Sequence, residues 1–241
     1  MGKGMSRELI SATLAEFIAT FGFVFLGVGA VGAALAAGGA DNRAFFIVVG
    51  LAHGLGILIG VVAIGRISGG HLNPAVTLAA IVTGNTSVMR GVLYVGAQLA
   101  GATLAMLLLK EYMFTTDDLG LHQVAGRLAT ADGVIIEIVL TFLLVFTVFA
   151  TAVDKRGNAA LAPIAIALVV AADHFVAVGL TGASMNPARS FGPAAVFGSW
   201  NDQWVYWAGP LMGGLLGALV YVVFFGEKEA RQNIGKIKLS D

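Results

Sequence analysis

Six long stretches of the chain are almost wholly apolar, and each is long enough to cross a lipid bilayer. They cover residues 10–35, 44–64, 88–109, 133–153, 159–180 and 205–225. The hydrocarbon core of a bilayer is about 30 Å thick, so a spanning helix needs roughly 20 mostly apolar residues. Backbone N–H and C=O groups in lipid must pair within their own segment. The pattern therefore predicts an all-α integral membrane protein with six transmembrane helices.

Two further apolar stretches, 72–82 and 185–196, are too short to cross and are candidates for re-entrant half-helices. Each contains the same tripeptide, Asn73-Pro74-Ala75 in the first and Asn186-Pro187-Ala188 in the second. Proline suits the first turn of a helix, where its missing N–H has no partner to lose. Asparagine is a favoured N-cap. Each tripeptide therefore predicts the start of a half-helix, although a cap alone would explain the asparagines without a further role.

The chain repeats its own pattern. A Glu-x-x-x-Thr-Phe sequence opens with Glu16 in the first span and with Glu137 in the fourth. Residues 1–120 and 121–241 would then each hold three spans and one half-helix within a single channel domain. Three spans per half make the second half inverted, so the half-helices enter from opposite faces and meet near the midplane. Such inverted repeats with broken helices mark a permeation site.

The predicted meeting point has a definite electrostatic character. Each half-helix N-terminus carries roughly half a positive charge. Two such ends that face one pore repel cations and protons. The side-chain amides of Asn73 and Asn186 would donate hydrogen bonds to a passing oxygen. Glu16 and Glu137 would accept hydrogen bonds from the backbone of the re-entrant loops and support them.

Composition narrows the function classes. Charged residues make up 12% of the chain, against about a quarter in soluble proteins, and the mean hydropathy is +0.88. A formal net charge of zero argues against a nucleic-acid partner. There are no cysteines and no local cluster of histidine and glutamate, so neither a metal site nor a cofactor is expected. An enzyme is not expected either, because no nucleophile–base arrangement occurs.

The distribution of lysine and arginine predicts the orientation. If both termini are cytoplasmic, ten basic residues, Lys3 among them, lie on that side of the membrane. The other side holds only Arg43, Lys110, Arg127 and Arg189. We therefore expect a multi-pass protein of the plasma membrane with cytoplasmic termini.

The motifs and their flanks, SGGHLNPAVT (68–77) and GASMNPARS (182–190), resemble the aquaporin family of major intrinsic proteins along nearly the whole chain. The resemblance implies a passive channel that conducts water and excludes protons and ions, as is known for aquaporin-type pores. It also implies a homotetramer in the lipid bilayer, with water and small neutral solutes as its partners. The alternatives are a glycerol or urea facilitator of the same fold and, from another class, a secondary transporter.

The resemblance also places a narrow selectivity filter. By spacing, its residues are His53, His174, Ala183 and Arg189. A charged side chain this deep in a membrane segment is costly and is functional by default, although an ion pair with a carboxylate would be an alternative for Arg189. Ser190 follows, where glycerol-conducting members carry aspartate, and this favours water.

The filter departs from the usual water-selective set, which has an aromatic residue in place of His53. Histidine at this position resembles the tonoplast intrinsic proteins of plants, some of which also line the filter with a loop histidine, here His122. A polar and slightly wider filter would pass ammonia as well as water. The alternatives are a core role for His53 and His174 and an exposed loop position for His122.

Overall fold

The structure is a computed structural model that describes residues 6–39, 44–113 and 116–240. Lys3 and Arg43, both used to predict the orientation, lie outside these residues. The regular elements described are all helices. In chain order they are α1 (Arg7–Ala36), α2 (Ala44–Ser68), α3 (Pro74–Val82), α4 (Val88–Tyr112), α5 (Thr130–Val148), the π-helix η1 (Phe149–Val153), α6 (Ala162–Ala177), α7 (Pro187–Phe197), α8 (Val205–Phe224) and α9 (Lys228–Asn233).

Five helices are long and apolar enough to cross a membrane: α1, α2, α4, α5 with η1, and α8. The sixth predicted span, 159–180, is shorter than expected. Its helix α6 has 16 residues, which corresponds to about 24 Å at 1.5 Å per residue. The helix begins late because Pro163 lies in its first turn, and it ends before the re-entrant loop that starts at Thr181. The predicted all-helical membrane fold is confirmed.

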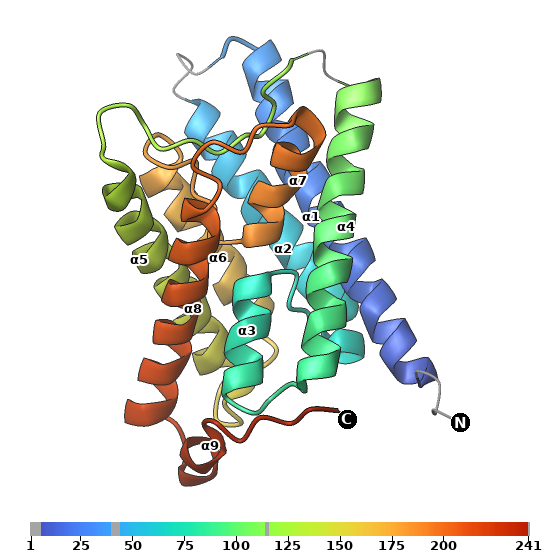
Figure 1. Ribbon diagram of the computed structural model, residues 1–241, viewed down its shortest axis with the longest axis vertical. Coiled ribbons are helices and arrows are strands. Elements are labelled where there is room, and N and C mark those ends of the chain that lie inside the picture. Colours follow the sequence, from blue (N-terminus) through green and yellow to red (C-terminus); the bar gives the residue numbers. More distant parts are fainter. Residues whose placement is uncertain (1–5, 40–43, 114–115, 241) are drawn as a thin grey trace.

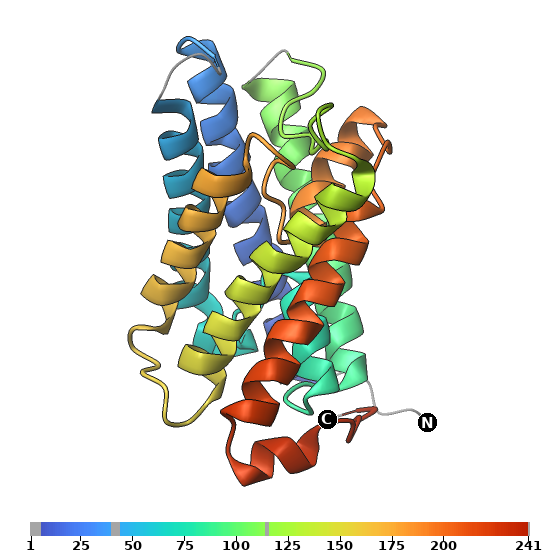
Figure 2. The same ribbon diagram turned by 90° about the vertical axis from the view of Figure 1, so that its left-hand side faces the viewer.

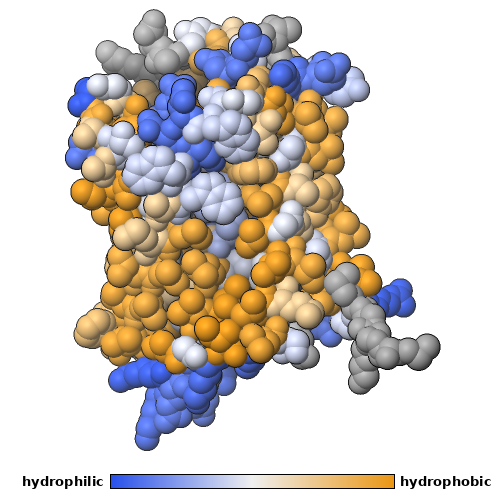
Figure 3. All heavy atoms as spheres, viewed as in Figure 1, coloured by the Kyte–Doolittle hydropathy of each residue, from blue (hydrophilic) through white to orange (hydrophobic). Residues whose placement is uncertain are grey.

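The two half-helices lie inside the bundle and point in opposite directions (Figures 1 and 2). Helix α3 lies in the lower half of Figure 1 and α7 in the upper half, and their N-terminal ends meet at mid-height. The start of α1 and all of α9 lie at one end of the molecule, here named the terminal end; the opposite end is the loop end. An apolar belt covers the middle of the surface in the view of Figure 3, with polar residues at both ends.

Each half contains one close helix crossing that depends on glycine. A Cβ atom on Gly101 of α4 would collide with the carbonyl oxygen of Phe17 in α1, and one on Gly213 of α8 with that of Ile138 in α5. Small residues are typical of such contacts between membrane helices. These crossings bring the third span of each half against the span that carries Glu16 or Glu137.

Candidate functional site

Glu16 holds the re-entrant loop before α3. Its carboxylate accepts hydrogen bonds from Ser68 Oγ (2.6 Å), from the backbone N–H groups of His71 (2.9 Å) and Leu72 (2.7 Å), and from Gln98 Nε2 (2.9 Å). The side chain is fully buried. Every one of these partners donates, so the carboxylate binds the loop through three of its groups and α4 through Gln98.

Glu137 does the same for the loop before α7. It accepts from Thr181 Oγ1 (2.6 Å) and from the backbone N–H groups of Ser184 (2.9 Å) and Met185 (2.8 Å). In both loops the two amides immediately before the asparagine and the hydroxyl five residues before it are bound. The two carboxylates are therefore bound to their loops in the same way.

A tyrosine fixes the far end of each loop. The hydroxyl of Tyr94 donates to the carbonyl oxygen of Ser68, and that of Tyr206 donates to the carbonyl oxygen of Thr181, both at 2.9 Å. Both tyrosines are fully buried. Sequence reasoning missed this pair and Gln98; the available signal was a polar side chain inside an apolar span.

The residue before each asparagine has a left-handed backbone. Leu72 has φ 51° and Met185 has φ 53°, a conformation that bulky side chains rarely adopt. The carbonyl oxygen of Leu72 accepts from Asn186 Nδ2, and that of Met185 accepts from Asn73 Nδ2, each at 2.8 Å. The strained residues thus join the two half-helices at their meeting point.

The asparagines also cap their own helices. Asn73 Oδ1 accepts from the amide of Ala75 at 2.8 Å, and Asn186 Oδ1 accepts from the amides of Ala188 and Arg189 at 3.0 and 3.4 Å. An asparagine amide has two N–H groups, and only one is used in the contact between the loops. Among the described residues, the second N–H of each side chain has no hydrogen-bond partner.

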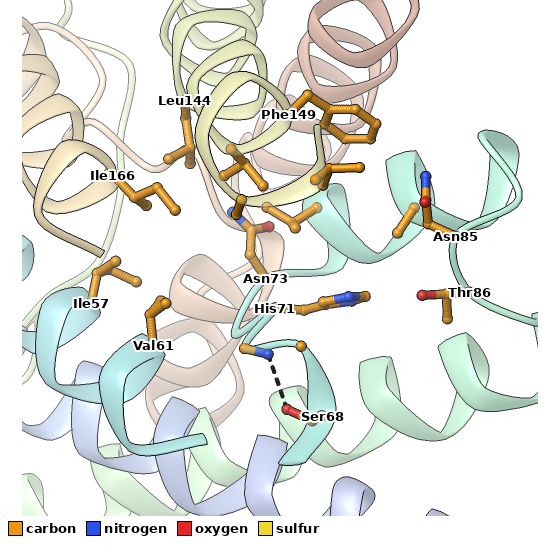
Figure 4. A pocket seen from close by; sticks show the side chains of 17 residues that line it. Ile57, Val61, Ser68, His71, Asn73, Asn85, Thr86, Leu144, Phe149 and Ile166 are labelled. Carbon is orange, nitrogen blue, oxygen red and sulfur yellow. Dashed lines mark hydrogen bonds between the residues drawn. The ribbon is translucent and has the colours of Figure 1, made fainter. Parts of the chain in front are cut away.

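A cavity of about 320 Å³ leads from the terminal end to Asn73 (Figure 4). His71 lies in its wall, and the loop beside it is fixed by the hydrogen bond from Gly70 N to Ser68 Oγ, 3.1 Å. Apolar side chains make up much of the remaining wall: Ile57, Val61, Leu144, Phe149 and Ile166. We name this cavity the vestibule of the candidate pore.

Three of the predicted filter residues meet toward the loop end. The rings of His53 and His174 stack with centroids 4.3 Å apart, and Arg189 Nε lies 3.3 Å from His53 Nε2. All three side chains are buried. Ala183, the fourth, is buried in the loop before Asn186, where its amide donates to Thr181 Oγ1 at 3.2 Å.

The hydrogen bonds determine which nitrogen of each imidazole carries the proton. Nδ1 of His53 lies 2.8 Å from the carbonyl oxygen of Val49, and Nδ1 of His174 lies 2.7 Å from that of Val170. A carbonyl only accepts, so both Nδ1 atoms donate, and in the neutral ring Nε2 is an acceptor. His53 Nε2 accepts from Arg189, whereas the buried Nε2 of His174 has no hydrogen-bond partner among the described residues.

His122 joins this region from the loop between α4 and α5. It is 6% exposed, not an exposed loop residue, and its ring packs against Gly182. Ser184 Oγ donates its only proton to the carbonyl oxygen of Asn186 (3.1 Å), so it must accept from Ser190 Oγ (2.5 Å). Because Ser190 has then used its own proton, its oxygen accepts from His122 Nδ1 (2.7 Å). Burial, with the positive charge of Arg189 next, holds the pKa of His122 well below its usual value.

Arg189 is held without a carboxylate. Besides His53, its guanidinium donates to the carbonyl oxygen of Gly120 through Nη1. In the described part of the chain no Asp or Glu forms an ion pair with it, so the alternative of a structural salt bridge is not supported. The guanidinium therefore presents a fixed positive charge beside two acceptor nitrogens.

Asp173 directly precedes His174 in α6. It is 5% exposed, and its Oδ2 atom has no hydrogen-bond partner among the described residues. It is buried in α6.

Comparison with known proteins agrees with this architecture. The family model described as major intrinsic protein matches residues 4–221. The chain is 48% identical to "Probable aquaporin TIP2-1" of Oryza sativa subsp. japonica over 94% of its own length and 92% of that protein. It is 45% identical to "Aquaporin TIP2-3" of Arabidopsis thaliana, covering 95% and 94%. Its fold is similar to the aquaglyceroporin of Plasmodium falciparum, with TM-score 0.77, 20% identity and coverage of 93% and 98%.

These relatives correct one expectation. They are TIP-type aquaporins, that is, tonoplast intrinsic proteins of the vacuolar membrane. The prediction of a plasma-membrane protein is therefore wrong, while a multi-pass membrane protein is supported. The error has a physical reason, because charge bias and hydropathy report how a chain crosses a bilayer and not which bilayer it crosses.

Proposed function

The chain belongs to the major intrinsic protein family and is a passive channel for water, and we propose that the water passes between Asn73 and Asn186 and then through a filter of His53, His174, Ala183 and Arg189. The observation that carries this proposal is the pair of linked asparagines, each with one amide N–H left for a solute. A water that accepts from both amides has its own hydrogens turned outward along the pore, so it cannot relay a proton at that point.

Two opposed half-helices support proton exclusion at the same place. Their N-terminal ends meet at mid-height, and each contributes about half a positive charge. Arg189 adds a second positive barrier beside His53. We propose that the dipoles and Arg189 together exclude protons and cations.

Flux through reconstituted vesicles tests this function. We expect stopped-flow shrinkage much faster than in empty liposomes, with a low activation energy and no proton leak under a pH gradient. Folded protein in sealed vesicles that gave no faster shrinkage would contradict the pore. A saturating flux that is coupled to an ion gradient would instead indicate a secondary transporter.

Ammonia is the additional solute that the filter favours. The free Nε2 of His174 accepts hydrogen bonds, and Arg189 donates them. Ammonia brings N–H donors and one lone pair, so it can use both groups. His53 is also smaller than the phenylalanine of the usual water-selective filter, and Ala183 is smaller than threonine.

A double substitution tests the ammonia proposal. In the variant His53→Phe with Ala183→Thr we expect ammonia-driven alkalinisation of vesicles to fall while water flux persists. An absence of ammonia flux in the unmodified protein, or an unchanged ammonia flux in the variant, would leave a strictly water-selective filter. Glycerol and urea belong in the same assay. Ser190 supports their exclusion because its hydroxyl is already bound between His122 and Ser184.

We further propose that the channel is a homotetramer with one pore per subunit. Family membership supports this state. Native mass spectrometry in mild detergent is expected to give a four-chain species, and a spectrum with monomer alone would contradict the proposal.

A further inference from the structure

Gly27 of α1 lies directly behind the imidazole of His53. Gly27 is buried. A Cβ atom built on it would lie 2.6 Å from Cδ2 and 2.7 Å from Nε2 of that ring. Side-chain carbons do not approach other heavy atoms this closely, so any larger residue at position 27 must displace the imidazole or the helix.

The ring has little freedom to yield. Its Nδ1 is bound to the carbonyl oxygen of Val49 in the preceding turn of α2, 2.8 Å away. The ring of Phe23, one turn before Gly27, meets it edge-on with centroids 5.9 Å apart. The stacked ring of His174 and the side chain of Arg189 complete its surroundings.

Displacement away from Gly27 therefore moves the imidazole toward the rest of the filter. His53 belongs to α2, which packs against both α1 and α6. The ring thus lies between Gly27 of α1 and His174 of α6. A shift toward α6 narrows the space beside His174 and misaligns Nε2 with the Nε–H of Arg189.

We propose that Gly27 is a positioning residue of the filter: its missing side chain lets His53 stand back from the pore and keeps Nε2 in line with Arg189. This inference rests on the proposed filter. It assigns part of the solute selectivity to a helix that contributes no side chain to the filter itself.

The test compares two substitutions on one helix. We expect Gly27→Ala to lower the water permeability per folded channel roughly three- to tenfold, because the added methyl group overpacks the filter. The matched control is Gly22→Ala, where a Cβ atom would meet nothing within 4 Å. Both changes replace a helical glycine by alanine, so they share any effect on helix propensity. An unchanged permeability in Gly27→Ala, or an equal fall in Gly22→Ala, would overturn the inference.

A double variant identifies the imidazole as the group that moves. In a His53→Ala background there is no ring to displace, so adding Gly27→Ala should leave permeability unchanged. The same fall in both backgrounds would show that Gly27 does not act through His53. If Gly27→Ala alone fails to fold, the double variant is still expected to fold, and its failure would also overturn the inference.

The same experiment separates this inference from the filter proposal. His53→Ala should by itself change the ratio of ammonia to water permeability. If it does not, the filter is wrongly assigned. If it does while Gly27→Ala has no effect, the filter stands and the role of Gly27 is wrong.

Discussion

The histidines of this chain share one pattern of hydrogen bonding. Nδ1 of His53, His122 and His174 donates to the protein. The fourth, His71, follows the same rule: Thr77 gives its only hydroxyl proton to the carbonyl oxygen of Asn73, so it accepts from His71 Nδ1 at 3.0 Å. In the neutral ring each Nε2 is left as an acceptor. The asparagines and Arg189 supply donors, so both kinds of hydrogen-bonding group occur along the path.

Replacement of Arg189 tests the charge at the filter. We expect Arg189→Val to retain water flux and to admit protons or small cations, because the positive charge of Arg189 is lost while the half-helix dipoles remain. Vesicles under a pH or salt gradient measure the leak. The control is Arg127→Val, an exposed arginine between α4 and α5. A variant that leaks no more protons or cations than the unmodified protein would show that the dipoles alone exclude ions.

The lowered pKa of His122 gives a prediction for stability against pH. Burial lowers the pKa of this ring in the folded protein, whereas the unfolded chain protonates it near pH 6.5. Its contribution to stability is therefore complete above about pH 6.5 and declines as the pH falls toward the folded pKa. Melting temperatures in detergent should drop on acidification, and less steeply in His122→Asn. An equal fall of melting temperature with pH in the two proteins would contradict the lowered pKa of His122.

At the scale of elements, the half-helices depend on the two glutamates more than on their own length. Helix α3 has 9 residues and α7 has 11, and isolated helices this short are marginal. Each begins at an N-capping asparagine and follows a loop bound to a buried carboxylate. The loops therefore hold the half-helices in place before any solute is present.

Removal of one negative charge should loosen one loop. We expect Glu137→Gln to lower the free energy of unfolding by about 2–4 kcal/mol, because an amide nitrogen then faces donors that need an acceptor. The control is Glu229→Gln on the exposed helix α9. Melting temperature and water flux, measured on the same preparation, test the change. Unaltered values of both would show that the carboxylate is not the support described.

Sequence patterns predicted these elements well where local chemistry decides them. The half-helices begin at Pro74 and Pro187, one residue after the predicted caps. The errors occur where tertiary contacts determine where a helix ends or changes its type. Helix α6 ends early because its loop is bound to Glu137, and α5 changes to the π-helix η1, which no apolar pattern indicates.

The site was predictable to a similar extent. The family resemblance, carried over by spacing, implied a filter of His53, His174, Ala183 and Arg189, and in the structure the side chains of His53, His174 and Arg189 lie together. The positions of Gly27 and Tyr94 behind the site could not be read from spacing, because they depend on how separate helices pack.

At the scale of the whole molecule, the two ends differ in how they meet the lipid. The chain has three tryptophans, and all lie between α7 and the first turn of α8, at the loop end. Trp200 is 52% exposed and Trp204 56%, and Phe191 packs against Trp200 with centroids 5.7 Å apart. Tryptophan favours the boundary between lipid and water, so this cluster indicates the level of that boundary at the loop end.

Native fluorescence can measure that level because no other tryptophan contributes. Lipids brominated near the head group should quench the emission more strongly than lipids brominated near the chain end. Trp200→Phe with Trp204→Phe should remove most of the quenching. Equal quenching by both lipids would contradict the placement.

The pore also differs between its ends, and this bears on how it could be blocked. Counted back from the two asparagines, His53 corresponds to Ile166 and His174 to Val61. The counterparts of these two histidines of the proposed filter are therefore apolar residues in the wall of the 320 Å³ vestibule at the terminal end. An apolar inhibitor that binds in this vestibule should act when applied to that face of an oriented vesicle and have no effect from the other. Inhibitors that bind the vestibule are thus expected to act from one side of the membrane only, although the water flow they stop runs equally in both directions.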